Sequence, residues 1–379
     1  GSAVYVIDLE SMNEQTGGQY PGKLAAGGNG LINIVDINNK FTDVDNDLHE
    51  DIPNSILGDP VVITPDTFIG AKWRGALVYV NDFEGKISKI NLTSDTTAND
   101  PSGTSINLFD HTTLFSLNAN GENGRLSYFG MDATLGEDTK NLYLFGSTGD
   151  FGDISRKSKG MDNILYGIRD KDFPNFRMVN SGAAASIAEA MNAKKIDDEY
   201  ELSPYCVNTA DDGADQGDCP ANKKDAWVFK LDKPQNKKND KSLVGPQGNA
   251  QQTDNLYQKA SASPTVFKGT VYYPVYQPTS GASCAVGNAY VCSADDECGI
   301  NTSEGIVSAV RMVDENAGFD ENTKCFYLQP GVLSKLVVFA DKLFANITTD
   351  SEDQKDSLIS LLANEGMISI EREGWRENY

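Results

Sequence analysis

Four aspartates near the start of the chain have the spacing of a calcium-binding loop. Residues 43–51 follow the pattern D-x-D-x-D-x-x-x-D. Calcium is a hard cation that prefers about six to eight oxygen ligands, whereas four carboxylates held this close without a cation would repel one another. The pattern predicts that Ca²⁺ is bound by the side chains of Asp43, Asp45, Asp47 and Asp51 and by the main-chain carbonyl of His49.

The loop differs from an EF-hand. Positions 6 and 12 of an EF-hand loop hold glycine and glutamate, but here they are Leu48 and Asn54. Helical signal is also thin on either side. We therefore expect an EF-hand-like loop in a β-sheet context. The alternative is a solvated acidic turn, which is plausible in a chain with 55 acidic residues.

Composition disfavours several other chemistries. The chain has 32 basic and 55 acidic residues and a formal net charge of −23, which disfavours binding to nucleic acids and anionic membranes. Its two histidines, His49 and His111, leave little material for a catalytic triad. Ser147, in the stretch 146–150, lacks the G-x-S-x-G pattern and reads as a turn. We therefore expect no enzyme activity. We also expect no membrane-spanning helix, because no run of 18 apolar residues occurs.

Six cysteines indicate disulfides and an oxidising compartment. They cluster in polar or glycine-rich segments without a C-x-x-C pair. Cys206 and Cys219 flank one loop and are predicted to pair with each other. The pairing of the other four is left open: Cys284, Cys292, Cys298 and Cys325.

Short apolar segments bounded by Gly, Asp, Asn or Pro predict an all-β protein. In the clearest repeat, residues 78–92, Glu84-Gly85 separates two alternating strands, as in a tight hairpin. Such hairpins, repeating at irregular spacing over most of the chain, favour an all-β propeller with irregular loop insertions and a few short helices. Two β-domains forming a sandwich are the alternative. The expected strands are 4–7, 31–35, 61–63, 77–80, 142–145, 164–168, 226–229, 270–273, 305–310, 335–339 and 367–370, and the expected helices are 183–191 and 356–362.

We expect residues 3–379 to form a single propeller-like domain of a longer protein, with Gly1 and Ser2 as an expression scar.

An ordered set of short motifs resembles the C-terminal domain of the PilY/PilC family of type IV pilus proteins. The loop 43–51 is similar to that family's calcium loop, 79–87 to its Y-A-G-D-L-x-G-N-L segment, 144–149 to F-x-G-T-G, and 166–170 to Y-A-I-x-D. Residues 262–266 and 269–273 resemble a late blade, Cys284 and Gly287 a C-x-x-G pair, and 374–377 a terminal W-R-E. The motifs span most of the chain.

This resemblance implies that the fold is a modified seven-bladed β-propeller. It also implies a calcium-binding protein of pilus biogenesis that balances pilus extension and retraction, and so supports twitching motility and surface adhesion. It further implies a place at the pilus tip or outer membrane of a bacterium, and contact with minor pilins through a preceding N-terminal region. A host or abiotic surface receptor is a further partner of some relatives. One alternative is a surface adhesin or glycan-binding propeller without a role in assembly. A quinoprotein enzyme is another, although its repeats are rich in tryptophan and this chain has three.

Overall fold

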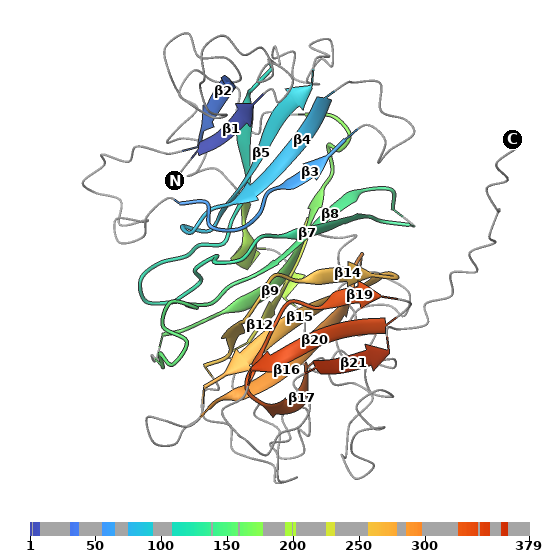
Figure 1. The fold of residues 1–379 in the computed structure, drawn as a ribbon. Helices are drawn as coiled ribbons and strands as arrows, with labels where there is room; N and C mark the ends of the chain where they lie inside the picture. The colour runs from blue at the N-terminus through green and yellow to red at the C-terminus, as the bar shows by residue number, and fades with distance from the viewer. Residues whose placement is uncertain are drawn as a thin grey trace, which may run out of the picture.

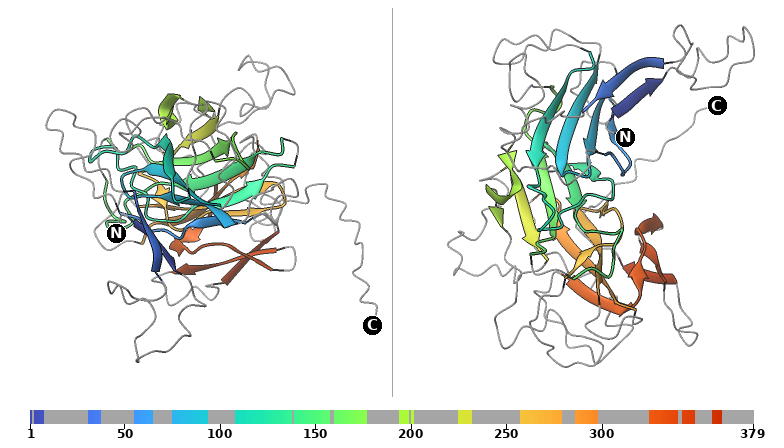
Figure 2. Two further views of the ribbon diagram at one scale, coloured as in Figure 1. Left: turned by 90° about the horizontal axis from the view of Figure 1, so that it is seen from above. Right: turned by 90° about the vertical axis from the view of Figure 1, so that its left-hand side faces the viewer.

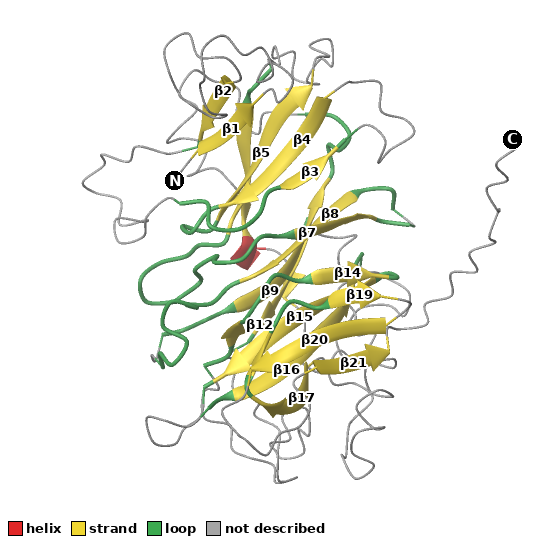
Figure 3. Cartoon of the chain, viewed as in Figure 1, coloured by secondary structure: helices red, strands yellow, loops and turns green. Residues whose placement is uncertain are grey.

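The chain folds into antiparallel β-sheets that follow one another in sequence order. The computed structural model describes residues 1, 3–7, 31–37, 55–64, 75–93, 108–137, 139–157, 160–176, 194–198, 200–201, 225–231, 257–278, 286–297, 325–339, 342–348 and 358–362. Within this part there are five sheets and one 3₁₀ turn, η3 (Ile196–Asp198). Strands therefore dominate the described structure (Figures 1 and 3).

The first sheet is a two-stranded ribbon, and the second begins the series of larger meanders. The ribbon pairs β1 (Ala3–Ile7) with β2 (Leu31–Asp36). The second sheet runs in chain order through β3 (Val61–Ile63), β4 (Gly75–Asn81), β5 (Lys86–Thr93) and β6 (His111–Ser116).

The third, fourth and fifth sheets repeat this up-and-down arrangement. The third contains β7 (Asp132–Leu135), β8 (Leu142–Ser147), β9 (Ile164–Asp170) and β12 (Ala226–Lys230). The fourth contains β13 (Lys259–Ala260), β14 (Thr265–Phe267), β15 (Thr270–Gln277), β16 (Asn288–Asp295) and β17 (Cys325–Pro330). The fifth contains β18 (Val332–Leu333), β19 (Val337–Phe339), β20 (Lys342–Thr348) and β21 (Leu358–Leu362).

Two very short strands extend the second and third sheets. The connection between β9 and β12 first adds β10 (Lys194–Lys195) parallel to β6 of the second sheet. After η3 it adds β11 (Tyr200–Glu201) parallel to β12 of the third sheet. One connection therefore completes the edges of two neighbouring sheets.

The alternation of apolar residues along each strand explains how the sheets stack. Side chains of a strand point alternately to its two faces. In β4, Leu77 and Tyr79 join the core shared with the third sheet, while Val78 and Val80 join the core shared with the β1–β2 ribbon. Burying both faces in this way stabilises neighbouring sheets that would be marginal alone.

The third sheet uses its two faces in the same manner. Leu144 and Tyr166 pack toward the second sheet, whereas Phe145 and Trp227 pack toward the fourth. Trp227 is 1% exposed and lies over Gly167, where an added Cβ would come within 2.4 Å of the indole ring. A residue larger than glycine at this position would therefore displace the tryptophan.

The five sheets lie along an arc with the ribbon at one end and the fifth sheet at the other, as the right-hand view of Figure 2 shows. The fourth and fifth sheets share a core that includes Tyr272, Val291 and Leu343. In the described part of the chain, no hydrophobic cluster joins the first sheet to the last. The all-β, blade-like architecture is confirmed, while the closure of the ring and its seven blades stay predictions.

The local predictions have mixed outcomes. The hairpin at Glu84-Gly85 is confirmed, since β4 and β5 pair across a turn in which Gly85 has a φ of +83°. The helix expected at 356–362 is wrong, because residues 358–362 form β21 on the edge of β20. Pairing with an existing strand outweighs the weak helix propensity of this segment. The expected helix at 183–191 and the expected strands at 305–310 and 367–370 lie outside the described residues.

Among the described residues, no helix is both long and apolar enough to cross a membrane.

Candidate functional site

The predicted calcium ligands Asp43, Asp45, Asp47, His49 and Asp51 lie outside the described residues. The described neighbours of this segment are Ile37, directly after β2, and Ser55, ahead of β3. Within the described ranges, no group of three or more His, Cys, Asp or Glu side chains is arranged to hold a metal ion. The described contacts nearest to the predicted loop are therefore those of Ile37 and Ser55.

Both ends of this segment are attached to the turn between β4 and β5. The Lys86 ammonium donates a hydrogen bond to the carbonyl oxygen of Ile37, with an N···O distance of 3.2 Å. The Phe83 amide donates to the carbonyl oxygen of Ser55 at 2.6 Å. One short turn thus fixes the two points between which residues 38–54 run.

The turn is itself well determined by hydrogen bonds. The Asp82 amide donates to the Lys86 carbonyl at 3.0 Å, and the Gly85 amide donates to the Asp82 carbonyl at 2.9 Å. The Lys86 amide donates to Asp82 Oδ1 at 2.8 Å. With Gly85 supplying the positive φ that the turn requires, the positions of Phe83 and Lys86 relative to each other are set locally.

Three charged side chains are buried in this turn. Asp82, Glu84 and Lys86 are 0%, 3% and 2% exposed. Lys86 Nζ lies 3.3 Å from Asp82 Oδ2 and 3.8 Å from Glu84 Oε2. Burial raises the pKa of Asp82 to about 6, an effect that Lys86 opposes and the charge of Glu84 reinforces. The ammonium therefore offsets the cost of placing two carboxylates in the interior.

The same turn contacts the connection that leads to the third sheet. The Leu117 amide donates to the Gly85 carbonyl at 2.7 Å. The Phe83 ring meets the Tyr128 ring edge-on, with 4.8 Å between centroids, and Asn81 Nδ2 donates to the Phe129 carbonyl at 2.8 Å. Ile37 and Ser55, the described residues on either side of the predicted calcium loop, are thus linked through the turn to residues 117–129.

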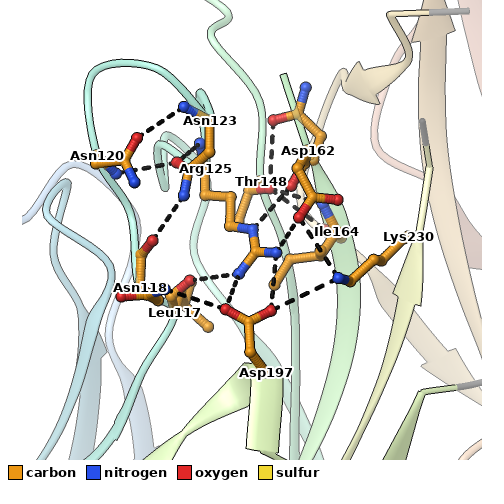
Figure 4. A network of polar contacts seen from close by, with 11 residues as sticks. Leu117, Asn118, Asn120, Asn123, Arg125, Thr148, Asp162, Ile164, Asp197 and Lys230 are labelled. Atoms are coloured by element: carbon orange, nitrogen blue, oxygen red, sulfur yellow. Dashed lines mark hydrogen bonds and ion pairs between the residues drawn. The ribbon is translucent and has the colours of Figure 1, made fainter. Parts of the chain in front are cut away.

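Arg125, within that connection, is the centre of a charged network (Figure 4). Its guanidinium donates to both carboxylate oxygens of Asp197 in η3, each at 2.9 Å, and also bonds to Asp162 ahead of β9. Burial works against ionisation of Asp197, but the hydrogen bonds and charge of Arg125 outweigh it and lower the pKa of Asp197. Lys230 lies 3.6 Å from Asp162 and 3.8 Å from Asp197. The network holds together four separate parts of the chain.

A further buried charged group joins two of the segments that carry the family resemblance. Tyr79 belongs to the first of these segments and Asp170 to the second. The Tyr79 hydroxyl donates to Asp170 Oδ2 at 2.7 Å, and Lys89 Nζ donates to the same oxygen at 2.6 Å. Lys89 also donates to the Asn175 carbonyl at 2.7 Å. Residues distant in sequence thus meet between the second and third sheets.

Sequence reasoning did not find these two networks. The partners of Arg125 lie 37 and 72 residues away, and those of Lys89 lie 81 and 86 residues away. No local spacing indicates such pairs. Tyr79 and Asp170 each lie in a motif that resembles the family. That is the one sequence signal that could have pointed to the network around Lys89.

The segment around Ser147 is described in full. Ser147 is the last residue of β8 and is buried, and its hydroxyl makes no hydrogen bond within the described structure. Residues 148–150 form the loop that follows. The prediction that Ser147 lies in a turn is therefore wrong, because Gly146 and Ser147 end β8 and the loop begins at Thr148.

One disulfide lies in the described part of the chain and confirms the expectation of disulfide bonding. Cys292 in β16 and Cys325 in β17 are directly opposite each other in the ladder, with their Cα atoms 3.9 Å apart. This pair was among the four cysteines left open. Cys206, Cys219, Cys284 and Cys298 lie outside the described residues, so the predicted Cys206–Cys219 bond stays a prediction.

A buried acidic residue after β16 makes stability depend on pH. Burial, followed by the charges of Asp295 and Glu297, raises the pKa of Asp296 to about 7. In the unfolded chain an aspartate titrates near pH ~3.9. The folded state therefore binds more protons between these two values, and its stability falls as the pH rises through this window.

We expect Asp296→Asn to raise the free energy of unfolding at pH 8 by about 1–2 kcal/mol and to leave it unchanged at pH 4. Urea unfolding of the variant and the wild type at pH 8 and pH 4 measures the change in free energy of unfolding. Asp59→Asn, at an exposed position, is the control and should change neither value. Equal gains at pH 4 and pH 8 for Asp296→Asn would show that its charge is not the cause.

The described fold is thus a series of blade-like antiparallel sheets. Among solved structures, the chain is similar to the crystal structure of the Pseudomonas aeruginosa PilY1 C-terminal domain, with a TM-score of 0.42 and 12% sequence identity. The match covers 80% of this chain and 59% of the PilY1 domain chain, so this chain spans less than two thirds of the length of that solved chain. No protein-family profile matches the sequence. No curated protein matches it either.

Proposed function

We propose that this chain is the calcium-binding domain of a pilus-associated protein at a bacterial cell surface. The observation that carries the proposal is the D-x-D-x-D-x-x-x-D pattern of residues 43–51 within an ordered set of motifs that resembles the PilY/PilC family. The donor set fits calcium, because carboxylate and carbonyl oxygens are its preferred ligands. Ile37 and Ser55, the described residues on either side of this segment, both accept hydrogen bonds from the β4–β5 turn.

In this proposal calcium acts without catalysis. Binding neutralises the aspartates and orders the loop, which favours one state of the pilus machinery. A ligand shifts such an equilibrium only by its differential affinity for the two states. The proposed partners are minor pilins, contacted through another region of the full-length protein, and a host or abiotic surface. The proposed outcome is control of pilus extension and retraction, and so of twitching and adhesion.

Calcium titration calorimetry tests the binding step. Wild-type protein should release or absorb heat on binding one Ca²⁺, and Asp47→Ala should weaken the affinity by tenfold or more, because it removes a central carboxylate ligand. Asp59→Ala removes an exposed aspartate outside the loop and should bind as the wild type does. The absence of binding heat for the wild type, or equal affinity for Asp47→Ala, would contradict the calcium assignment.

Surface pili and twitching test the biological step in the parent strain, with the full-length gene. Asp47→Ala should resemble calcium removal, and Asp47→Lys should resemble calcium occupancy because it supplies a fixed positive charge. Normal pili and normal twitching for both variants at all calcium concentrations would remove the regulatory role. A strain that still forms pili but no longer attaches would instead indicate an adhesin without a part in assembly.

A further inference from the structure

We infer that copies of this chain associate head to tail through the two end sheets of the arc. One end sheet is the β1–β2 ribbon and the other is the fifth sheet, at the opposite end of the arc (Figure 2). The contact joins the outer face of the ribbon in one copy to the outer face of the fifth sheet in the next. It uses no residue of the predicted calcium loop, so it is independent of the proposed function.

The ribbon has one apolar face toward the second sheet and another that faces outward. Val4 and Val35 pack in the core that the ribbon shares with the second sheet. On the outer face, Tyr5 and Ile34 are directly paired across the two strands, and Ile7 follows on the same side of β1. Tyr5, Ile34 and Ile7 are 53%, 42% and 40% exposed. Antiparallel sheets with one face in water carry polar residues on that face, and the ribbon does not.

The fifth sheet is built in the same way. Leu343 and Ile347 of β20 point into the core shared with the fourth sheet. On the outer face Val337 lies directly opposite Phe344, and the rings of Phe339 and Phe344 meet edge-on with 6.3 Å between centroids. Val337 and Phe339 are 60% and 69% exposed, the highest values among the large apolar side chains of the described residues. The fifth sheet therefore also presents an apolar outer face.

Packing of sheet on sheet is the contact that builds the rest of the arc. The second, third and fourth sheets each bury apolar side chains on both faces, whereas the described clusters include only one face of each end sheet. A second copy that places its ribbon on the fifth sheet continues the stack with the same kind of contact. Such a contact joins two different faces, so it is heterologous and repeats from copy to copy.

Charge singles out these two faces for contact with a second copy. The net charge of −23 opposes association of two copies in general. The ribbon strands, however, contain a single charged residue, Asp36, and residues 332–348 contain two lysines and one aspartate, Lys335, Lys342 and Asp341. The ribbon is thus weakly negative and the fifth sheet weakly positive, which favours pairing of unlike faces over pairing of like faces. The overall charge disfavours nucleic acid and anionic lipid as the occupant.

Sedimentation velocity at protein concentrations from about 1 to about 200 μM tests this inference. Faces of two or three short strands are small, so we expect micromolar association of the wild type rather than a permanent oligomer. Raising the salt concentration should strengthen the association, because screening weakens the repulsion between copies. Association that weakened with salt, or a wild type that stayed monomeric throughout, would overturn the inference.

Three single variants locate the contact. Ile34→Glu and Phe339→Glu each place a carboxylate in one of the two faces, and each should weaken self-association at least tenfold. Val62→Glu is the matched control, because Val62 is 53% exposed on β3 and belongs to neither end sheet. It adds the same charge and should associate as the wild type does. The replaced side chains are exposed, so thermal unfolding of each variant should stay close to that of the wild type.

A mixture of the two weakened variants tests the head-to-tail arrangement. Ile34→Glu keeps an intact fifth-sheet face and Phe339→Glu keeps an intact ribbon face, so their equimolar mixture should form one-to-one dimers and nothing larger. Strong self-association of either variant alone, or a mixture that stays monomeric, would contradict pairing of unlike faces. Hydroxyl-radical labelling of Tyr5 and Phe339 should decrease as the wild-type concentration rises. Equal protection of both side chains in the monomer would show that the chain closes on itself, which would also overturn the inference.

Discussion

Replacing Lys89 by methionine is expected to lower the free energy of unfolding by about 3–5 kcal/mol. Lys89 Nζ lies 2.6 Å from Asp170 Oδ2, and both side chains are almost fully buried. Methionine preserves most of the side-chain volume but removes the positive charge, so the Asp170 carboxylate is left in the interior with the Tyr79 hydroxyl and without its cation. Guanidinium unfolding of the single variant at pH 7 measures the loss.

Two further variants separate the charge from the packing. Lys89→Met/Asp170→Asn should recover part of the stability, because no buried charge remains and the asparagine oxygen can still accept the Tyr79 hydrogen bond, whereas its NH2 group cannot accept from the Asp172 amide as the carboxylate does. Lys335→Met changes an exposed lysine and should stay within about 0.5 kcal/mol of the wild type. If Lys89→Met unfolded within 1 kcal/mol of the wild type, the ion pair would not contribute to the joint between the sheets.

The position of Lys89 shows where sequence reasoning ends. On β5, the period-two pattern correctly predicts that Ile87 faces a core, and Lys89 follows on the same face. A lysine two residues after an apolar one would ordinarily be assigned to solvent. It is buried because Asp170 arrives from β9, 81 residues later, and supplies the opposite charge.

Hairpins and strand faces could be predicted because they depend on neighbours in the sequence. The turn at Glu84-Gly85 and the two apolar faces of β4 follow from turn chemistry and from alternation. The strands β10 and β11 could not be predicted, since each is two residues long and exists only as an addition to an existing edge. The strand β21 was assigned to a helix for the same reason: its partner β20 decides its conformation.

The candidate site divides along the same line. All four aspartates of the predicted calcium loop fall within residues 43–51, so a calcium site can be proposed from their spacing alone. The hydrogen bonds that Lys86 and Phe83 donate to the carbonyls of Ile37 and Ser55 could not be predicted, because they join residues that are distant in sequence. Residues that are contiguous in the chain leave a pattern in the sequence, whereas hydrogen bonds between residues far apart leave none.

The disulfide between β16 and β17 should have the second large effect on stability. Cys292 and Cys325 are 33 residues apart in sequence, and cross-linking them restricts the unfolded chain. For a closed loop of this size the entropic stabilisation is about 3–4 kcal/mol. Both cysteines are also buried in the core between the third and fourth sheets, alongside Tyr273 and Tyr290. The double variant Cys292→Ala/Cys325→Ala is therefore expected to lose at least this amount.

Guanidinium unfolding of the double variant and of the wild type, both refolded in reductant, separates the cross-link from the lost sulfur atoms, because any other disulfide is then reduced in both samples. If the cross-link dominates, the two reduced samples should have nearly equal stability, below that of the oxidised wild type. Amide hydrogen exchange in β17 should also accelerate in both samples, because the covalent link between β17 and β16 is then absent. A reduced wild type as stable as the oxidised protein, with unchanged exchange in β17, would show that the strand pairing and the core hold β17 in place without the covalent bond.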